Sequence, residues 1–332
     1  GRMSLPFGLC LLTLFGLAAL GTPVGYAILV GAIVYLAMAG QDIALAGEQI
    51  LAGLYQSFVL LAVPLFIVAA NIMNAGTISE RLLRFCVALV GRFRGGLGHV
   101  NVLASLIFSG MSGSAVADAA GIGKIVIEMM TKSGQFTRGY AAAITAASAT
   151  IGPIIPPSIP MVLYALVSNS SIGYLFLGGI LPGLLMGAVL MGMNVWLSAR
   201  RSFAAGDPVP LRDLPGLTAN AFPALLMPAI LLYGIYGGIT TPTEAAAVAA
   251  FYALLLAGVF YRALTARALY GIFVESARAS AVVGLVIGGA LILNYIVASE
   301  RVPQALAAAM AGLEVSPLLF LLGVNLLILL LG

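Results

Sequence analysis

The sequence predicts an all-α, polytopic membrane protein, and its composition leads to that prediction. Of the 332 residues, 62% are hydrophobic and only 8% are charged, whereas soluble domains carry about 25% charged residues. The mean hydropathy is +1.13. A formal net charge of +4, with most of the basic residues in short loops between apolar runs, does not support a nucleic-acid-binding protein. The two cysteines, Cys10 and Cys86, lie in separate apolar or amphipathic stretches, and their spacing suggests neither a metal site nor a disulfide.

Apolar segments that approach the roughly 20 residues of a membrane span recur along the whole chain. They cover residues 5–21, 23–39, 58–74, 138–169, 172–198, 218–236, 243–262, 279–298 and 316–332. Basic residues gather around 81–94, 132–138, 200–212 and 262–267, and they are absent from the loops at 40–49, 168–174 and 237–243. The positive-inside rule therefore places the basic loops in the cytoplasm and the N-terminus on the outer side of the membrane.

Residues 97–131 predict a re-entrant hairpin, because both of its ends are cytoplasmic by charge. Its tip, Ser109 to Ser114, is too polar and glycine-rich to face lipid, and such backbone is tolerated only where protein or water covers it. The apolar segment 138–169 is interrupted between Ile151 and Pro160 by four prolines, which lack an N–H and clash with the preceding turn. We interpret this segment as a broken helix; a simple proline kink is the alternative.

An internal repeat favours a secondary transporter. Matching residues recur in the same order at offsets of 219 to 224: Thr22-Pro23 with Thr241-Pro242, Asn71 with Asn294, Ser79-Glu80-Arg81 with Ser299-Glu300-Arg301, and Asn101 with Asn325. An odd number of crossings separates the copies, so the second copy is expected to be inverted. Inverted repeats with discontinuous helices are typical of secondary transporters. The second hairpin stops short at residue 332, so we expect the second repeat to be incomplete and the chain to be truncated at its C-terminus.

The hairpin tip and the helix break hold the candidate cation-binding residues. Unwound carbonyls and helix C-terminal ends suit Na⁺, whereas helix N-termini suit carboxylates. The predicted cation site comprises Ser109, Gly110, Ser112, Gly113, Ser114, Thr145, Ser148, Thr150, Gly152 and Pro153. The alternative is that these small residues only allow close helix packing.

Three charged residues are further candidates for a role in function or structure. Asp118 is the only carboxylate near the tip of the hairpin, and a carboxylate inside the membrane is costly and usually functional. It is a candidate for coupling a proton or supporting a bound cation; capping the second arm or pairing with Lys124 is the open alternative. Glu244 is predicted to cap a helix that starts at Thr241-Pro242. Arg301 is a candidate for contact with an anionic substrate or, equally, an interfacial arginine.

Two other classes of protein fit the pattern less well. Gly110 to Gly113 matches the Gly-x-Ser-Gly of intramembrane serine proteases, with Ser112 as nucleophile. The only histidine, His99, is thirteen residues away, or about 20 Å along a helix, whereas a general base acts within about 3 Å. A channel also uses unwound backbone, but channels usually assemble symmetric subunits, whereas an inverted repeat within one chain favours alternating access.

Two long motifs resemble those of a known family. Residues 108–123 read FSGMSGSAVADAAGIG and residues 145–160 read TAASATIGPIIPPSIP. Together they resemble the large membrane subunit, of the DctM type, of tripartite ATP-independent periplasmic (TRAP) transporters, and the likeness extends over the whole chain. The resemblance implies a secondary transporter rather than an enzyme. Such subunits import organic acids, dicarboxylates among them, across the bacterial inner membrane by sodium symport with an elevator motion.

The resemblance also implies partners and a division of the chain. The partners are a small four-helix membrane subunit of the DctQ type and a periplasmic substrate-binding protein of the DctP type, and Na⁺ is a coupling ion rather than a cofactor. The implied parts are scaffold helices at 1–75 and 218–300; amphipathic arms at 76–96 and 301–315; a transport-domain half at 97–200, with its hairpin at 97–131, broken helix at 138–169 and helix at 172–198; a cytoplasmic loop at 201–217; and the first arm of a second hairpin at 316–332.

The family's first sodium site maps onto the predicted cation residues, and its second belongs to a segment that follows residue 332. The residues expected to face the substrate are Ser112, Ser114, Pro156, Pro157, Ser158 and Arg301. The identity of the organic acid stays open, because much of the selection is expected to rest in the binding protein.

Overall fold

The predicted all-α class is confirmed. The structure, a computed structural model, describes residues 4–56, 58–74, 77–168, 170–206, 208–210, 212–311 and 316–331. All regular elements in these ranges are helices, and the only extended pairing among them is an isolated antiparallel bridge between Arg94 and Ala205. The predicted stretches at 76–96 and 301–315 each lie partly outside the described residues.

Four helices of the described part are long and apolar enough to cross a membrane. They are α11 (Ile172–Arg200), α12 (Leu214–Tyr236), α13 (Pro242–Leu255) extended by the π-helical turn η3 (Leu256–Phe260), and α14 (Ala266–Ser299). The chain is therefore a multi-pass membrane protein. Several other predicted spans form shorter apolar helices: α1 (Leu5–Ala19), α2 (Val24–Met38) and α16 (Pro317–Leu331) have 15 residues each, about 22 Å of helix.

Two helix bounds differ from the sequence prediction. Helix α14 begins at Ala266 rather than near residue 279, because alanines and other good helix formers continue the helix beyond the apolar stretch. Residues 44–56, left between two predicted spans, form the helix α3 (Ala44–Gln56). Its Glu48 and Gln49 interrupt the apolar run, so hydropathy alone misses a segment that nonetheless contains no proline and several strong helix formers.

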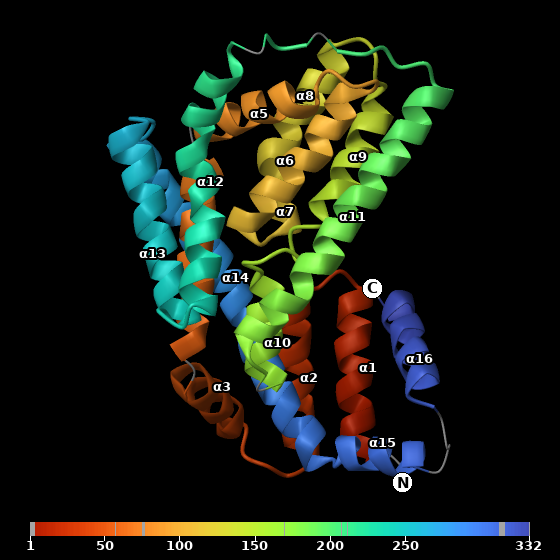
Figure 1. The fold of residues 1–332 in the computed structure, drawn as a ribbon. Helices are drawn as coiled ribbons and strands as arrows, with labels where there is room; N and C mark the ends of the chain where they lie inside the picture. The colour runs from red at the N-terminus through yellow and green to blue at the C-terminus, as the bar shows by residue number, and fades with distance from the viewer. Residues whose placement is uncertain are drawn as a thin grey trace. The chain divides into compact units, whose positions relative to one another are not determined.

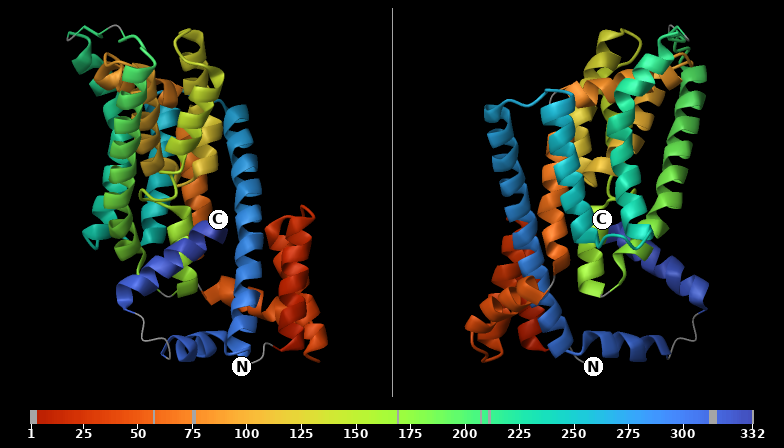
Figure 2. Two further views of the ribbon diagram at one scale, coloured as in Figure 1. Left: turned by 90° about the vertical axis from the view of Figure 1, so that its right-hand side faces the viewer. Right: turned by 60° about the vertical axis from the view of Figure 1, so that its left-hand side comes forward.

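The chain divides into two compact units, one built from residues 1–56 and 284–332 and the other from residues 57–283. In the first unit, α1 and α2 lie side by side (Figures 1 and 2). They approach closely at Gly31, where a Cβ would lie 3.0 Å from the carbonyl oxygen of Cys10. The carboxylate of Glu300 accepts hydrogen bonds from the hydroxyls of Ser4 at 2.6 Å and Tyr35 at 2.9 Å. These hydrogen bonds link the two chain segments, 1–56 and 284–332, that make up the unit.

The second unit contains the predicted hairpin and the broken helix. Helix α6 (Gly96–Ser112) ends at Gly113, and the chain returns through α7 (Ala115–Asp118), the π-helical turn η2 (Ala119–Gly123) and α8 (Lys124–Lys132). The interruption predicted between residues 151 and 160 is present, because α9 (Arg138–Ala149) is followed by irregular backbone up to α10 (Ile159–Ser168). Helices α6, α8 and α9 pack together (Figure 1).

Two contacts hold this group of helices in place. The Nδ2 of Asn194, buried in α11, donates to the carbonyl of Gly95 at 3.2 Å, and its Oδ1 accepts from the Tyr140 hydroxyl at 2.6 Å. A Cβ at Gly98 would lie only 2.2 Å from the same Oδ1. On the other side of the unit, α13 packs against α4 (Ala62–Asn74). Helix α4 is thereby positioned as one wall of the site described below.

The predicted cap at Glu244 is confirmed. The backbone N–H of Glu244 donates to the Thr241 hydroxyl at 3.3 Å, and the Glu244 carboxylate accepts from the Thr241 backbone N–H at 2.7 Å. This reciprocal arrangement is a capping box. We expect Thr241→Val to lower the free energy of unfolding by about 1 kcal/mol, because it leaves an N-terminal N–H of α13 without its partner. Thermal unfolding in detergent would measure this, and an unchanged melting temperature in Thr241→Val would contradict the expectation.

Candidate functional site

Asp118 lies at the centre of the hairpin tip. It is 1% exposed, and its Oδ1 accepts a hydrogen bond from the Ser112 hydroxyl at 2.5 Å. Its Oδ2 accepts from the Ser109 hydroxyl at 3.3 Å. Two predicted cation-binding hydroxyls therefore converge on one buried carboxylate.

The contacts of the second hairpin arm bear on the structural alternative for Asp118. The second arm is capped by Ser114, whose hydroxyl accepts from the Ala117 backbone N–H at 3.3 Å. Asp118 is thus not the cap, and among the described residues no ion pair joins it to Lys124. Neither contact of the structural alternative is thus seen among the described residues, and a coupling role for Asp118 stays a prediction.

The irregular backbone of the broken helix packs directly against the tip. A Cβ at Gly113 would lie 2.3 Å from the carbonyl oxygen of Pro157, and Gly113 has a φ of +61°. The Ile159 backbone N–H donates to the Gly113 carbonyl at 3.4 Å. A Cβ at Gly152 would lie 2.9 Å from Oδ2 of Asp118. The absence of side chains at both glycines is therefore what lets the two interrupted elements touch.

A second group of buried hydroxyls lies between α6 and α9. The Asn101 Nδ2 donates to the Thr145 hydroxyl at 2.6 Å. The Ser148 hydroxyl donates to the Asn101 Oδ1 at 3.2 Å and accepts from Ser105 at 2.8 Å. The Ser109 hydroxyl also contacts the Ser105 carbonyl at 2.5 Å. These bonds form a continuous polar path from Thr145 to Asp118.

The remaining predicted site residues are placed differently. The Thr150 hydroxyl is exposed and donates to the Ala147 carbonyl within its own segment, so it does not join the buried group.

The residues predicted to face the substrate lie in different places. The buried Ser158 hydroxyl donates to the Pro153 carbonyl at 2.5 Å and accepts from the Met161 N–H at 3.3 Å, which caps α10. The Pro156 carbonyl oxygen would lie 3.8 Å from a Cβ at Gly110, at the tip. Arg301 belongs to the other unit, where it is exposed.

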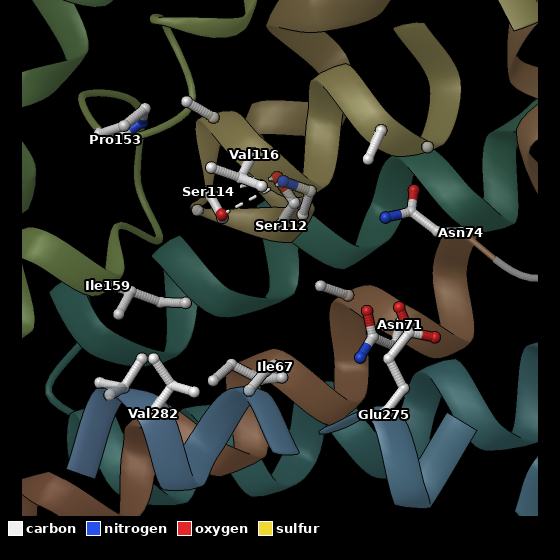
Figure 3. Close-up of a pocket in the computed structure, with 18 of the residues that line it drawn as sticks. Ile67, Asn71, Asn74, Ser112, Ser114, Val116, Pro153, Ile159, Glu275 and Val282 are labelled. Atoms are coloured by element: carbon white, nitrogen blue, oxygen red, sulfur yellow. Dashed lines mark hydrogen bonds between the residues drawn. The ribbon is translucent and has the colours of Figure 1, made fainter. Parts of the chain in front are cut away.

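A cavity of about 870 Å³ opens beside the tip (Figure 3). Ser112 to Ala117, Ala120 and Gly121 line it from the hairpin, and Pro153, Ile159, Pro160 and Leu163 line it from the broken helix. Parts of α4 and α14 form another wall. Cavities of roughly 300–1,000 Å³ accommodate small organic ligands, so the space suits a small metabolite.

The polar groups of this cavity come from both walls. Ser112 and Ser114 project from the tip, while Asn71 and Asn74 of α4 and Glu275 of α14 project from the other side (Figure 3). The Asn71 Nδ2 donates to the Ser276 hydroxyl at 2.9 Å, which ties α4 to α14. The rest of the lining is mostly apolar, so a ligand would be oriented by few polar contacts.

Sequence reasoning missed Asn74 and Glu275 and noted Asn71 only as part of the repeat. Glu275 was outside the predicted span, because the apolar run begins four residues later. The signal that would have found it is the helical continuation of residues 266–280, which carries a carboxylate toward the membrane. Asn74 gives no such signal, because a polar residue at the end of an apolar segment is what a helix terminus normally shows.

The serine protease alternative fails on geometry. His99 lies in the first turn of α6 and Ser112 in its last turn, which separates them by about 20 Å along one continuous helix. A general base must approach its nucleophile to within about 3 Å. The Ser112 hydroxyl donates instead to Asp118.

Sequence comparisons place the chain among known proteins. Residues 11–332 match the family described as "Tripartite ATP-independent periplasmic transporter, DctM component". The chain is 43% identical over 318 residues to the sialic acid TRAP transporter large permease protein SiaM of Vibrio cholerae, covering 96% of this chain and 74% of that protein.

Two further relatives carry other substrates in their names. The 2,3-diketo-L-gulonate TRAP transporter large permease protein YiaN of Escherichia coli is 36% identical over 320 residues, covering 96% of this chain and 75% of the relative. The C4-dicarboxylate TRAP transporter large permease protein DctM of Vibrio cholerae is 33% identical over 347 residues, covering 97% and 75%. This chain belongs to the DctM family of TRAP transporter large permease subunits.

Proposed function

We propose that this chain forms most of a permease that imports an organic acid across the bacterial inner membrane, driven by a sodium gradient. The names of all three relatives specify carboxylic acids or their anions. The proposed orientation, with a periplasmic N-terminus, rests on the distribution of basic residues. The proposed partners are a small four-helix membrane subunit and a periplasmic binding protein that delivers the acid.

The observation that carries the sodium proposal is the buried carboxylate at the tip. An anionic Asp118 buried among Ser109, Ser112 and Gly152 is costly without a balancing positive charge. Hydroxyl and carboxylate oxygens are the hard ligands that alkali and alkaline-earth cations prefer. Na⁺ entering beside Asp118 would supply the missing charge, and the Ser112 hydroxyl would then turn its lone pairs toward the ion.

The acid is proposed to bind in the adjoining cavity. Ser112 belongs both to the carboxylate cluster and to the cavity lining. A cation held at Asp118 would thus lie next to the substrate and attract its carboxylate, which couples the two binding events through one residue. Ser114 and the backbone of Gly113 would add hydrogen bonds on the same side. The apolar remainder of the cavity would exclude water.

We further propose alternating access by an elevator motion in which the hairpin and the broken helix move together. Their close packing at Gly113 and Gly152 supports movement as one body. The inverted repeat stays a prediction. Asn71, Asn74 and Glu275 would contact the substrate from the opposite wall.

Uptake in proteoliposomes would test the function. The whole gene product is reconstituted with its small subunit, and labelled organic acids are presented on the cognate binding protein. We expect accumulation with an inward Na⁺ gradient but not with the same K⁺ gradient. Ser112→Ala is expected to raise the Na⁺ concentration for half-maximal uptake about tenfold, because it removes a hydroxyl shared by both sites.

The uptake measurement has a control variant, and three of its outcomes would contradict the proposal. Ser133→Ala, in the exposed turn after α8, is expected to leave uptake unchanged. Uptake that follows a pH gradient and ignores Na⁺ would contradict sodium coupling. Equilibration without accumulation would indicate a channel, and a correctly folded protein without uptake under any gradient would contradict the transporter proposal.

A further inference from the structure

A second polar cavity lies away from the candidate transport site, beside α5 (Thr77–Val90). It has a volume of about 200 Å³ and is lined by Glu80, Arg81 and Arg84 of α5 and by Leu217 and Asn220 of α12. All five residues belong to the unit of residues 57–283. None of them takes part in the tip, the break or the cavity described above.

Arg81 is held in place with unused hydrogen-bonding capacity. Its guanidinium carbon lies 4.4 Å from the centre of the Tyr261 ring, a cation–π contact that fixes the position of the head group. One terminal nitrogen donates to the Asn220 Oδ1 at 3.5 Å, a long bond. Its Nε is buried and has no partner among the described residues. A buried donor without an acceptor is unfavourable, so the site is suited to an additional acceptor.

Arg84 supplies a second positive charge at the mouth of the cavity. Its only ion pair among the described residues is with Glu80 at 4.0 Å, and the two side chains are 71% and 58% exposed. An exposed pair at this distance contributes little stability. Arg84 is therefore available to an anion that also reaches Arg81, and Glu80 is the one opposing charge in the lining.

An apolar groove continues directly from this basic cavity. It has a volume of about 640 Å³ and shares Glu80, Arg84 and Leu217 with the smaller cavity. Its other lining residues are apolar and come from α5, α8 and the segment before α12: Leu83, Val87, Ile125, Met129 and Val209. The basic cavity and the apolar groove are therefore adjacent and share part of their lining.

The arginines of α5 belong to a cluster of basic residues that the sequence predicts to be cytoplasmic. Ile78, Leu82 and Cys86 are fully buried along one face of α5, in the core of the unit, while Glu80 and Arg84 lie on the opposite, exposed face. The cluster at 81–94 flanks a predicted membrane segment, and the positive-inside rule puts such loops at the cytoplasmic surface, where anionic headgroups are found. We therefore expect the basic cavity to lie near the headgroups of that surface.

We infer that this composite site binds one anionic phospholipid, with its phosphate at Arg81 and Arg84 and an acyl chain along the groove. Basic pockets between membrane helices bind anionic headgroups, and a guanidinium binds phosphate through paired hydrogen bonds. A free phosphate would satisfy the two arginines but would leave the apolar groove unused. The continuity of the two cavities is what favours a lipid.

Native mass spectrometry of the whole protein would test the site. The protein is released from detergent micelles that contain either phosphatidylglycerol or phosphatidylcholine with the same acyl chains. We expect preferential retention of phosphatidylglycerol. In Arg81→Ala and Arg84→Gln the preference is expected to fall about fivefold, the equivalent of about 1 kcal/mol per basic residue.

Controls separate binding from folding and from nonspecific charge. Arg267→Ala removes an exposed arginine of α14 and is expected to leave retention unchanged. Arg84→Gln alters only an exposed side chain, so it remains informative should Arg81→Ala fail to fold. Equal retention of phosphatidylglycerol in Arg84→Gln and the unmodified protein would overturn the proposal. Displacement of the lipid by excess inorganic phosphate, with phosphate alone raising the melting temperature equally, would also overturn it in favour of a free-anion site.

Discussion

Replacing Gly113 by alanine is expected to separate the hairpin tip from the broken helix and to reduce transport more than tenfold. The new Cβ would lie 2.3 Å from the Pro157 carbonyl oxygen and 3.2 Å from the Ile159 backbone nitrogen. Both are backbone atoms and cannot rotate away as a side chain would. Overpacking costs about 1–3 kcal/mol, and the left-handed φ of +61° adds about 1–2 kcal/mol for a residue with a Cβ.

A second glycine provides a matched control for this prediction. Gly134 has a similar φ of +70°, but nothing lies within 4 Å of the position that its Cβ would take. Gly134→Ala should therefore show the backbone cost alone, about 1–2 kcal/mol, and retain transport. Melting temperatures in detergent and uptake rates measure the two effects. If both variants lose the same stability and activity, the contact between Gly113 and Pro157 is unimportant.

Replacing Asp118 by asparagine is expected to reduce sodium-driven uptake more than tenfold. The substitution keeps the size of the side chain but removes its negative charge and one of the two acceptors that Ser109 and Ser112 use. The amide nitrogen would then face a hydroxyl oxygen, and a cation would meet no counter-charge. Initial uptake rates measured over a range of Na⁺ concentrations would show whether the loss lies in sodium affinity.

The control for Asp118 is a carboxylate outside the tip. The side chain of Asp213 is 52% exposed, and the distance between its Oδ1 and the Nε of Arg212 is 3.7 Å, which is long for an ion pair. Asp213→Asn is therefore expected to leave uptake unchanged. Uptake by folded Asp118→Asn at the original rate and the original sodium dependence would remove Asp118 from the proposed coupling.

The two interruptions of the chain could be predicted because their residues are unambiguous. Four prolines within ten residues cannot remain helical, and a run of serines and glycines cannot face lipid. The same reasoning predicts that Ser109 and Ser112, which lie in this run, belong to the candidate site. The sequence does not predict that Asp118 accepts hydrogen bonds from both hydroxyls. A carboxylate near a helix start can turn toward the backbone, toward a basic residue or toward the tip, and spacing alone does not distinguish these directions.

Other features depend on contacts between distant segments. Glu275 enters the cavity only because α14 begins thirteen residues earlier than its apolar run, and because α14 packs beside α4. Proximity in sequence predicts that Thr150 belongs to the cation site, yet its hydroxyl donates to the Ala147 carbonyl within its own segment. Spacing along one helix indicates a shared face, but it does not show which partner that face will meet.

The hydrogen bonds from Ser4 and Tyr35 to Glu300 have a consequence for biogenesis. The first and last segments of that unit are neighbours in space, but the ribosome must add residues 57–283 between them. At about 5–20 residues per second this takes on the order of tens of seconds. During that interval α1, α2 and α3 must reside in the bilayer without the partner that completes their core. Until residues 284–300 have been made, the N-terminal helices therefore lack the hydrogen bonds that Glu300 accepts.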